Sequence, residues 1–132
     1  MYDKPERIQY TIAAFDFGGA SATLTQVVAG PAGKRGKVAY AHVYDVTETF
    51  VGTTTGGGVW VGLSGDTDAY FKNSITSLAG SSPAVAAAKM LTNSLTGYNE
   101  IPADTPVHIS LVECVGGTIT GIASVDVIID WY

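Results

Sequence analysis

Apolar and polar residues alternate with a period of two along most of the chain, which is the pattern of half-buried β-strands. In the segment RIQYTIA the alternation places Ile8, Tyr10 and Ile12 on one face. It resumes on the opposite parity at Phe15. A strand with a bulge or bend near residues 13 and 14 is therefore predicted.

The next two strands are expected on either side of a turn. SATLTQVVA has the Thr and Val content of a strand, and the GPAGKRG after it is typical of a turn that joins adjacent strands. Residues 37–52 alternate for longer than a usual strand of about three to ten residues, so a bend or bulge is expected there. One parity of this segment consists of Val38, Tyr40, His42, Tyr44 and Val46.

The middle of the chain has the weakest pattern. VWVGL and AYF are short strand candidates on either side of SGDTD. In SPAVAAAKMLTNS, Ser82 and Pro83 stand where a helix would begin, which favours a short helix over residues 83–92, with a strand as the alternative. TGYNEIPADTP is expected to be a polar loop.

The end of the chain has the clearest pattern. VHISLVECV and GIASVDVIIDWY flank a short Gly-rich turn and are expected to pair. In the second of them, one face consists of Val125, Val127, Ile129 and Trp131. About seven or eight short strands at regular spacing, with little helix, predict an antiparallel β-sandwich of the jelly-roll kind. Residues 1–132 are expected to form one such domain.

Charge and composition limit the classes of partner that the chain is expected to bind. Charged residues make up only 14% of the chain, against about 25% in ordinary soluble domains, so partner proteins are expected to cover part of the surface. The net charge of −5 disfavours nucleic-acid binding, which usually needs a basic surface. No apolar run reaches the ~18 residues of a membrane helix, and MYDKPERIQY lacks the apolar core of a secretory signal. With the single Cys114, this predicts folding in a reducing cytoplasm.

No set of residues in the sequence indicates catalysis, a cofactor or a metal. Neither His42 nor His108 belongs to a motif that would place an activated nucleophile beside it. Asp66 and Asp68 have part of the spacing of a calcium loop, but Tyr and Phe follow instead of further oxygen donors. TTTGGGVW lacks the Lys and the Ser or Thr of a phosphate loop. We therefore predict a non-enzymatic protein.

The candidate partner-binding residues are Lys34, Arg35, Lys37, Trp60, Asp66, Asp68 and Tyr98. The three basic residues form a positive tip on an acidic protein, which suits docking to an acidic partner. The aromatic residues, together with Tyr70, suit either a subunit interface or a sugar platform on which the two aspartates would accept hydroxyl hydrogen bonds. These two uses of the same residues belong to different classes of protein.

Two segments resemble small structural proteins of tailed bacteriophages. ADTPVHISLVECVGGTITGIASVDVIIDWY is similar to their closing segment, in which a TPV strand and a Gly-rich hairpin precede a GIA-x-VDV-x-IDW strand. VYDVTETFVGTTTGGGVWVGLSGDTDAYF is similar to another part of that pattern. The resemblance implies a capsid-associated β-sandwich that is assembled in the host cytoplasm, either a decoration (cement) protein on the capsid exterior or a head or tail accessory protein. Such proteins are commonly trimeric, bind where capsid subunits meet and have no catalytic residues.

The sequence thus predicts a capsid decoration (cement) protein that stabilises the lattice of the major capsid protein and uses no cofactor. Its expected partners are the major capsid protein and further copies of the chain, with a homotrimer favoured, and neither nucleic acid nor a membrane. Docking loops are expected at residues 34–37, 53–58, 65–68 and 98–104. The alternative is a carbohydrate- or receptor-binding sandwich of a tail or head fibre. A small hydrolase is the third hypothesis, and no motif supports it.

Overall fold

The structure, a computed structural model, describes residues 5–18, 24–51, 58–74, 89–97, 99–113 and 120–132. These ranges contain strands, turns and irregular segments and no helix. In chain order the strands are β1 (Glu6–Asp16), β2 (Leu24–Val28), β3 (Gly36–Val51), β4 (Gly58–Leu63), β5 (Asp66–Ser74), β6 (Lys89–Leu91), β7 (Val107–Val112) and β8 (Thr120–Trp131).

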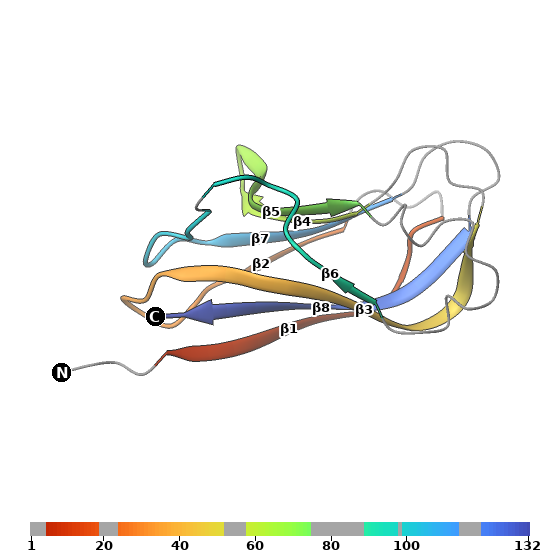
Figure 1. Cartoon of the computed structure of the whole chain (residues 1–132), viewed down its shortest axis with the longest axis horizontal. Coiled ribbons are helices and arrows are strands. Elements are labelled where there is room, and N and C mark those ends of the chain that lie inside the picture. Colours follow the sequence, from red (N-terminus) through yellow and green to blue (C-terminus); the bar gives the residue numbers. More distant parts are fainter. Residues whose placement is uncertain (1–4, 19–23, 52–57, 75–88, 98, 114–119) are drawn as a thin grey trace.

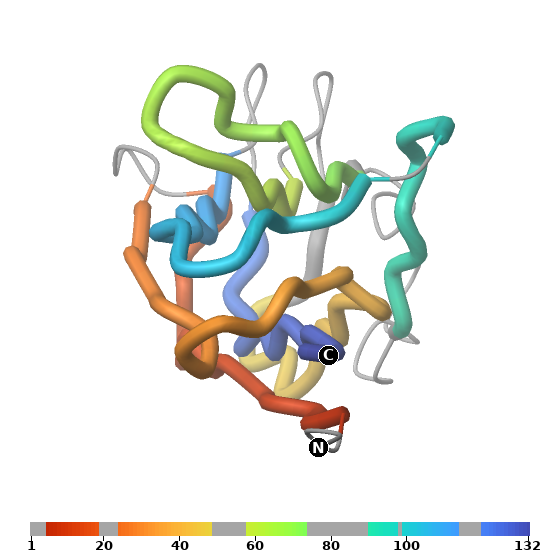
Figure 2. Tube along the Cα trace, turned by 90° about the vertical axis from the view of Figure 1, so that its left-hand side faces the viewer, coloured from red at the N-terminus to blue at the C-terminus, as the bar shows by residue number. Residues whose placement is uncertain are grey.

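The strands form two sheets that face each other across a shared core (Figures 1 and 2). The first sheet has the order β1-β8-β3-β6, and the second sheet has the order β2-β7-β4-β5. Every neighbouring pair is antiparallel. Two four-stranded sheets connected in this order form a jelly roll, so the predicted fold class is confirmed.

The predicted bulge in β1 is confirmed. β1 pairs with β8 in a regular register up to Ile12, which lies opposite Val125, and the register then shifts so that Phe15 lies opposite Ala123. Ala14 within the bulge has a φ of 49°, a left-handed conformation that is uncommon for residues other than glycine. The extra residue lets both Ile12 and Phe15 point into the core.

Bulges also occur in β3, as its length predicted, and the first of them changes which residues share a face. The register with β8 shifts between Val38 and Tyr40, and Val38 is buried while Tyr40 is only half-buried. Beyond the bulge the buried residues are Ala41 and Val43. In the sequence, Val38, Tyr40, His42 and Tyr44 alternate as if they shared one face of the strand. Because of the bulge they do not, and the last three face outward.

Three local predictions are wrong. The expected pairing of VHISLVECV with GIASVDVIIDWY does not occur, because β7 belongs to the second sheet and β8 to the first. Residues 89–91 form the strand β6, which pairs with β3 through Ala41, His42 and Val43, so the predicted helix does not extend into them. The rest of that helix, residues 83–88, lies outside the described residues. The GPAGKRG turn connects β2 to β3, which belong to different sheets, so it carries the chain across the sandwich instead of closing a hairpin.

β8 is the centre of the first sheet, as expected of the most strongly patterned segment. It lies between β1 and β3, and Val125, Val127, Ile129 and Trp131 are all buried in the shared core. Its other face is also covered, because Ile128 is only 5% exposed. Most of the buried hydrophobic residues contributed by the second sheet come from β4, β5 and β7.

Candidate docking surface

Several turns gather at one end of the sandwich, which we call the turn end. It consists of the β2–β3 connection around residues 31–35, residues 100–105 before β7, the turn between β4 and β5, and Tyr132 (left in Figure 1). Three of the four predicted docking loops, residues 34–37, 65–68 and 98–104, thus have described residues at this end. In the remaining loop, residues 53–57 lie outside the described residues, and Gly58 begins β4 at the opposite end.

Paired backbone hydrogen bonds fix the turn end. The N–H of Gly36 donates to the carbonyl of Ile101 at 3.0 Å, and the N–H of Ile101 donates back at 2.7 Å. The same reciprocal arrangement joins Arg35 and Tyr132, at 2.9 and 2.8 Å. The N–H of Gly33 donates to the Asp104 carboxylate at 2.8 Å. Three separate segments of the chain are therefore held in one arrangement before any partner binds.

The three basic residues of the predicted tip lie in different environments. Lys34 is buried, and its ammonium group lies 3.1 Å from the Glu6 carboxylate, so it is part of the fold and not an exposed docking residue. Arg35 is the exposed one, with 64% of its side chain accessible and a longer ion pair to Glu100 at 3.5 Å. Lys37 is exposed on β3 and lies opposite Asp130 of β8. The predicted basic tip is thus reduced to Arg35 and Lys37.

An ion pair between β1 and β8 of the first sheet lies at the same end of the sandwich. The Arg7 guanidinium donates to both carboxylate oxygens of Asp130, at 2.6 and 2.9 Å. The hydrogen bonds from Arg7 lower the pKa of Asp130 below its ordinary value, although partial burial acts in the opposite direction. Arg7 also lies over the Tyr40 ring, 5.8 Å from its centre. A two-point contact of this kind orients both side chains.

This ion pair makes a testable contribution to stability. Because the pKa of Asp130 is lower in the folded chain than in the unfolded chain, the pair stabilises the fold above the ordinary aspartate pKa of about 4. That contribution is lost as the pH falls through the folded-state pKa. We expect Asp130→Asn to lower the melting temperature at pH 7 by no more than a few degrees, since exposed pairs stabilise weakly. The difference from wild type should close as thermal melts are repeated towards pH 2, and an equal difference at both pH values would contradict the assignment.

Trp60, another of the predicted residues, lies on the outer face of the second sheet. Trp60 of β4 is half-buried there, and the Lys72 ammonium group lies 5.0 Å from the centre of its ring. Lys72 is in turn held by Asp68, at 3.3 Å. A lysine over the ring occupies the face on which a sugar would stack. Tyr70 is only 6% exposed, so it does not provide an exposed platform either.

Asp66 and Asp68 lie at the start of β5, and Tyr98 lies outside the described residues. Within the described ranges, no group of three or more His, Cys, Asp or Glu side chains could hold a metal ion. The structure also places His42 and His108 on the outer faces of different sheets, so it does not bring them together.

A polar cluster that sequence reasoning missed lies on the outer face of the first sheet. The Asp126 carboxylate accepts hydrogen bonds from the hydroxyl groups of Thr11, at 2.7 Å, and Tyr44, at 3.0 Å. Burial, and then the hydrogen bond to Asp126, raise the pKa of Tyr44. The His42 ring stacks on Tyr44 with 5.2 Å between centres. Asp126 is only 7% exposed, so its carboxylate is largely covered although it lies on the outer face.

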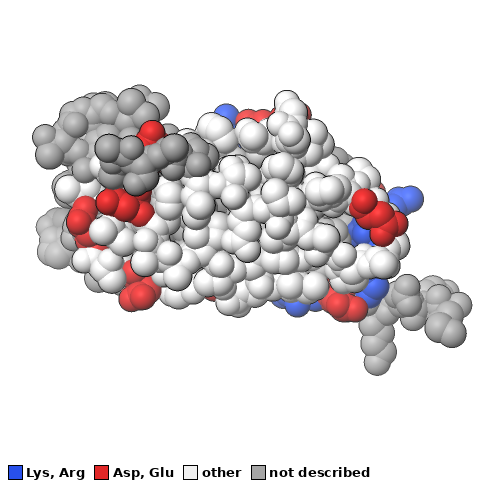
Figure 3. Space-filling model, turned by 180° about the vertical axis from the view of Figure 1, so that it is seen from behind, with Lys and Arg blue, Asp and Glu red and all other residues white. Residues whose placement is uncertain are grey.

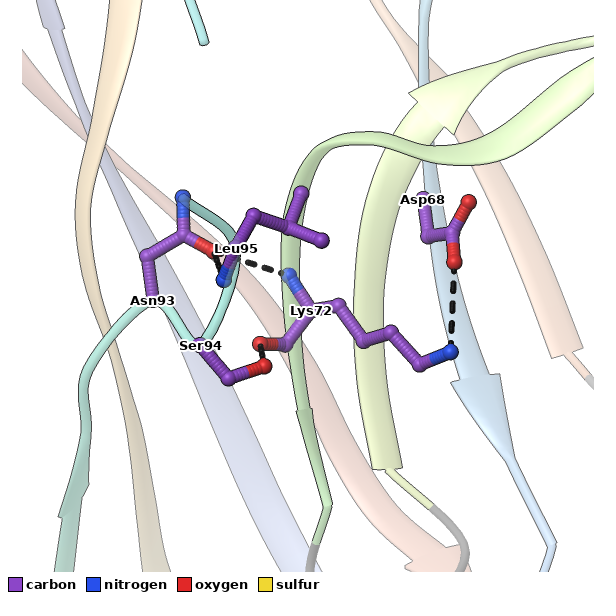
Figure 4. A network of polar contacts seen from close by, with 5 residues as sticks. All are labelled: Asp68, Lys72, Asn93, Ser94 and Leu95. Atoms are coloured by element: carbon purple, nitrogen blue, oxygen red, sulfur yellow. Dashed lines mark hydrogen bonds and ion pairs between the residues drawn. The ribbon is translucent and has the colours of Figure 1, made fainter. Parts of the chain in front are cut away.

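A short segment after β6, which we call the strap, runs along one side of the sandwich. Residues 92–95, which follow β6, lie against the edge of β5 (Figure 4). The Ser94 N–H donates to the Lys72 carbonyl at 2.9 Å, and the Lys72 N–H donates to the Asn93 side chain at 3.2 Å. The Asn93 amide also donates to the Tyr70 carbonyl at 3.0 Å. The strap therefore joins the first sheet, through β6, to the edge strand β5 of the second sheet.

No protein-family model, no curated protein and no solved structure matches this chain. The described residues also include no helix that is long and apolar enough to cross a membrane.

Proposed function

We propose that the chain is a virion structural protein that decorates a capsid and docks through its turn end onto the shell of the major capsid protein. The observation that carries this proposal is the reciprocal hydrogen bonding that locks residues 33–36, residues 101–104 and Tyr132 together. A surface that is rigid before binding loses little conformational entropy when it docks. Binding residues are also commonly found on loops that a rigid scaffold positions.

The chemistry of the turn end suits a polar protein surface. Arg35 is exposed beside Glu100, and the Tyr132 hydroxyl group donates to the same carboxylate at 2.5 Å. Tyrosine and arginine are enriched at protein interfaces, where each provides both contact area and hydrogen bonds. The low charged content of the whole chain and its resemblance to phage structural proteins support a capsid as the partner.

Such a protein would act by bridging. Each copy would contact neighbouring capsid subunits, and a ligand that binds only the assembled shell stabilises it by mass action. The effect grows with the logarithm of the ratio of free protein to its dissociation constant, about 2.7 kcal/mol at a hundredfold excess. A shell saturated with the protein is therefore expected to melt at a higher temperature than an empty one.

We expect Arg35→Ala to weaken binding to empty capsid shells about tenfold, because the substitution removes an exposed arginine from the docking surface. Binding is measured by co-sedimentation with the shells, and shell melting by scanning calorimetry. The matched control is Thr47→Glu, which gives the same net charge but lies on exposed β3 away from the turn end. Wild-type protein that does not bind the shells, or an equal loss of binding in both variants, would contradict the proposed docking surface.

A further inference from the structure

The two sheets have four edges, and three of them are protected against pairing with another chain. The edge of β5 is covered by the strap of residues 92–95. The edge strand β6 is only three residues long. β1 carries Glu6 and Arg7 and is bent by the bulge at Ala14. Coverage, shortness, charge and bulges are the features by which natural proteins prevent edge-to-edge association.

β2 has none of these features. Its five residues, LTQVV, include no charge and no proline, and its register with β7 is unbroken from Leu24 to Val28. It is the first strand of the second sheet, so none of the described strands pairs with its outer edge. Leu24 is 41% exposed and Val27 is 57% exposed. The strand thus presents backbone groups and apolar side chains together, as strands that accept another strand do.

The surface around β2 is also uncharged. β1 and β2 lie on the side of the sandwich opposite β6 (Figure 2), and Figure 3 looks at that side from behind. Lys, Arg, Asp and Glu lie mainly towards the two ends of this view, and the surface between them is broad and uncharged. No like charges would therefore face each other if two such surfaces came together.

We propose that β2 pairs with β2 of a second copy, antiparallel and about a twofold axis at Gln26. This register places Leu24 opposite Val28 of the second copy, so that apolar side chains meet on the core side of the sheet. Thr25 lies opposite Val27 of the second copy on the outer side, where β-branched pairs are favourable. The second sheets of the two copies then form one continuous sheet, and the twofold axis limits the assembly to a dimer.

The strand's own sequence favours a second copy as the occupant. An isologous contact requires a surface that complements itself, and LTQVV has apolar residues on both sides of a central Gln. The whole chains repel each other weakly, because each carries a net charge of −5. Salt screens this repulsion but not the apolar and backbone contacts. Association is therefore expected to strengthen as salt is added, whereas an association based on ion pairs would weaken.

The test uses the purified chain without capsid shells, so it is independent of the proposed docking function. Sedimentation velocity of the wild type over a range of protein concentrations is expected to show a monomer–dimer equilibrium. This equilibrium should shift towards the dimer when the NaCl concentration is raised about tenfold, from about 50 to about 500 mM. Val27→Lys should raise the dissociation constant at least tenfold, because it places two new charges in the paired edge. The matched control is Ala13→Lys, which adds the same charge to the exposed bulge of β1 on the same side and should leave association unchanged.

A covalent test fixes the register. In a Cys114→Ser background, Gln26→Cys should form a disulfide-linked dimer on mild oxidation, because the two residues lie opposite each other at the twofold axis within disulfide reach. Ala13→Cys in the same background should remain monomeric. A wild type that is monomeric at all concentrations, a trimer, or a dimer that Val27→Lys leaves intact would each overturn the pairing of β2. A trimer would instead agree with what the resemblance to phage proteins implies.

Discussion

Removal of the last four residues, 129–132, is expected to abolish cooperative folding. Ile129 and Trp131 are at most 1% exposed and lie in the shared core. Truncation of a buried isoleucine or tryptophan to alanine costs about 2–5 kcal/mol each, which together approaches the whole stability of a typical domain. The deletion also leaves Glu6 and Ile8 of β1 and Gly36 and Val38 of β3 without their β8 partners.

Close packing around the Trp131 side chain is a further reason to expect that the truncated chain does not fold. A Cβ atom at Gly30 or Gly36 would lie within 2.6 Å of the Trp131 ring, so the surrounding chain is shaped closely around the indole. The indole N–H also donates to the Tyr10 hydroxyl group at 3.1 Å. Loss of Trp131 therefore leaves a cavity, and the Tyr10 hydroxyl group loses its hydrogen bond from the indole.

Tyr132→Ala is the control for the deletion. It removes a side chain that is 42% exposed and keeps the backbone hydrogen bonds between Tyr132 and Arg35. Thermal melts followed by circular dichroism should show a cooperative transition for this variant and none for the truncated chain. A truncated chain that melts cooperatively near the wild-type temperature would show that β8 is not needed to close the sandwich.

The parts of the fold that the sequence predicted are those in which local pattern and final burial agree. Ile12 and Phe15 are both apolar and on opposite parities, so their joint burial requires the extra residue that the structure shows between them. In β8 the alternation of Val125, Val127, Ile129 and Trp131 is uninterrupted, and all of them are buried. Period-two alternation is a reliable guide where the register is unbroken.

The parts that failed depend on long-range structure. The bulge between Val38 and Tyr40 shifts the face of β3 by one residue, and no local signal at Ala39 indicates it. Lys34 is buried because Glu6, far away in the sequence, provides a counter-charge. Residues 89–91 form a strand because β3 offers them an edge, which overrides their local helix preference.

The polar cluster at Asp126 was missed for the same reason. Its partners, Thr11 and Tyr44, come from the two strands that flank β8, and only the pairing of β1 with β8 and of β3 with β8 brings them together. An isolated aspartate on an alternating strand is more often exposed than buried. Here the strands on either side bring two hydroxyl groups to the buried carboxylate, and both donate to its Oδ1 atom.

Gly62→Ala is expected to be the most damaging single-atom addition in the second sheet. A Cβ at Gly62 would lie 2.1 Å from the carbonyl oxygen of Asp66 and 2.4 Å from the carbonyl carbon of Thr67. These are backbone atoms at the start of β5, so they cannot move aside as a flexible side chain can. Gly62 lies at the register shift between Val61 and Leu63 in the pairing of β4 with β5. We expect a loss of about 3 kcal/mol or more, which lowers the melting temperature by roughly 10 °C.

Gly65→Ala tests whether this loss comes from the close approach and not from the loss of a glycine in the turn. Nothing lies within 4 Å of the position that its Cβ would occupy, and its φ is not in the left-handed region. Alanine there should leave stability unchanged or raise it by about 0.4–1 kcal/mol, because the unfolded chain has fewer conformations. Urea titrations of both variants separate the two cases. Similar midpoints for Gly62→Ala and Gly65→Ala would mean that β5 can move away from β4, so the hairpin would not be rigidly fixed to the second sheet.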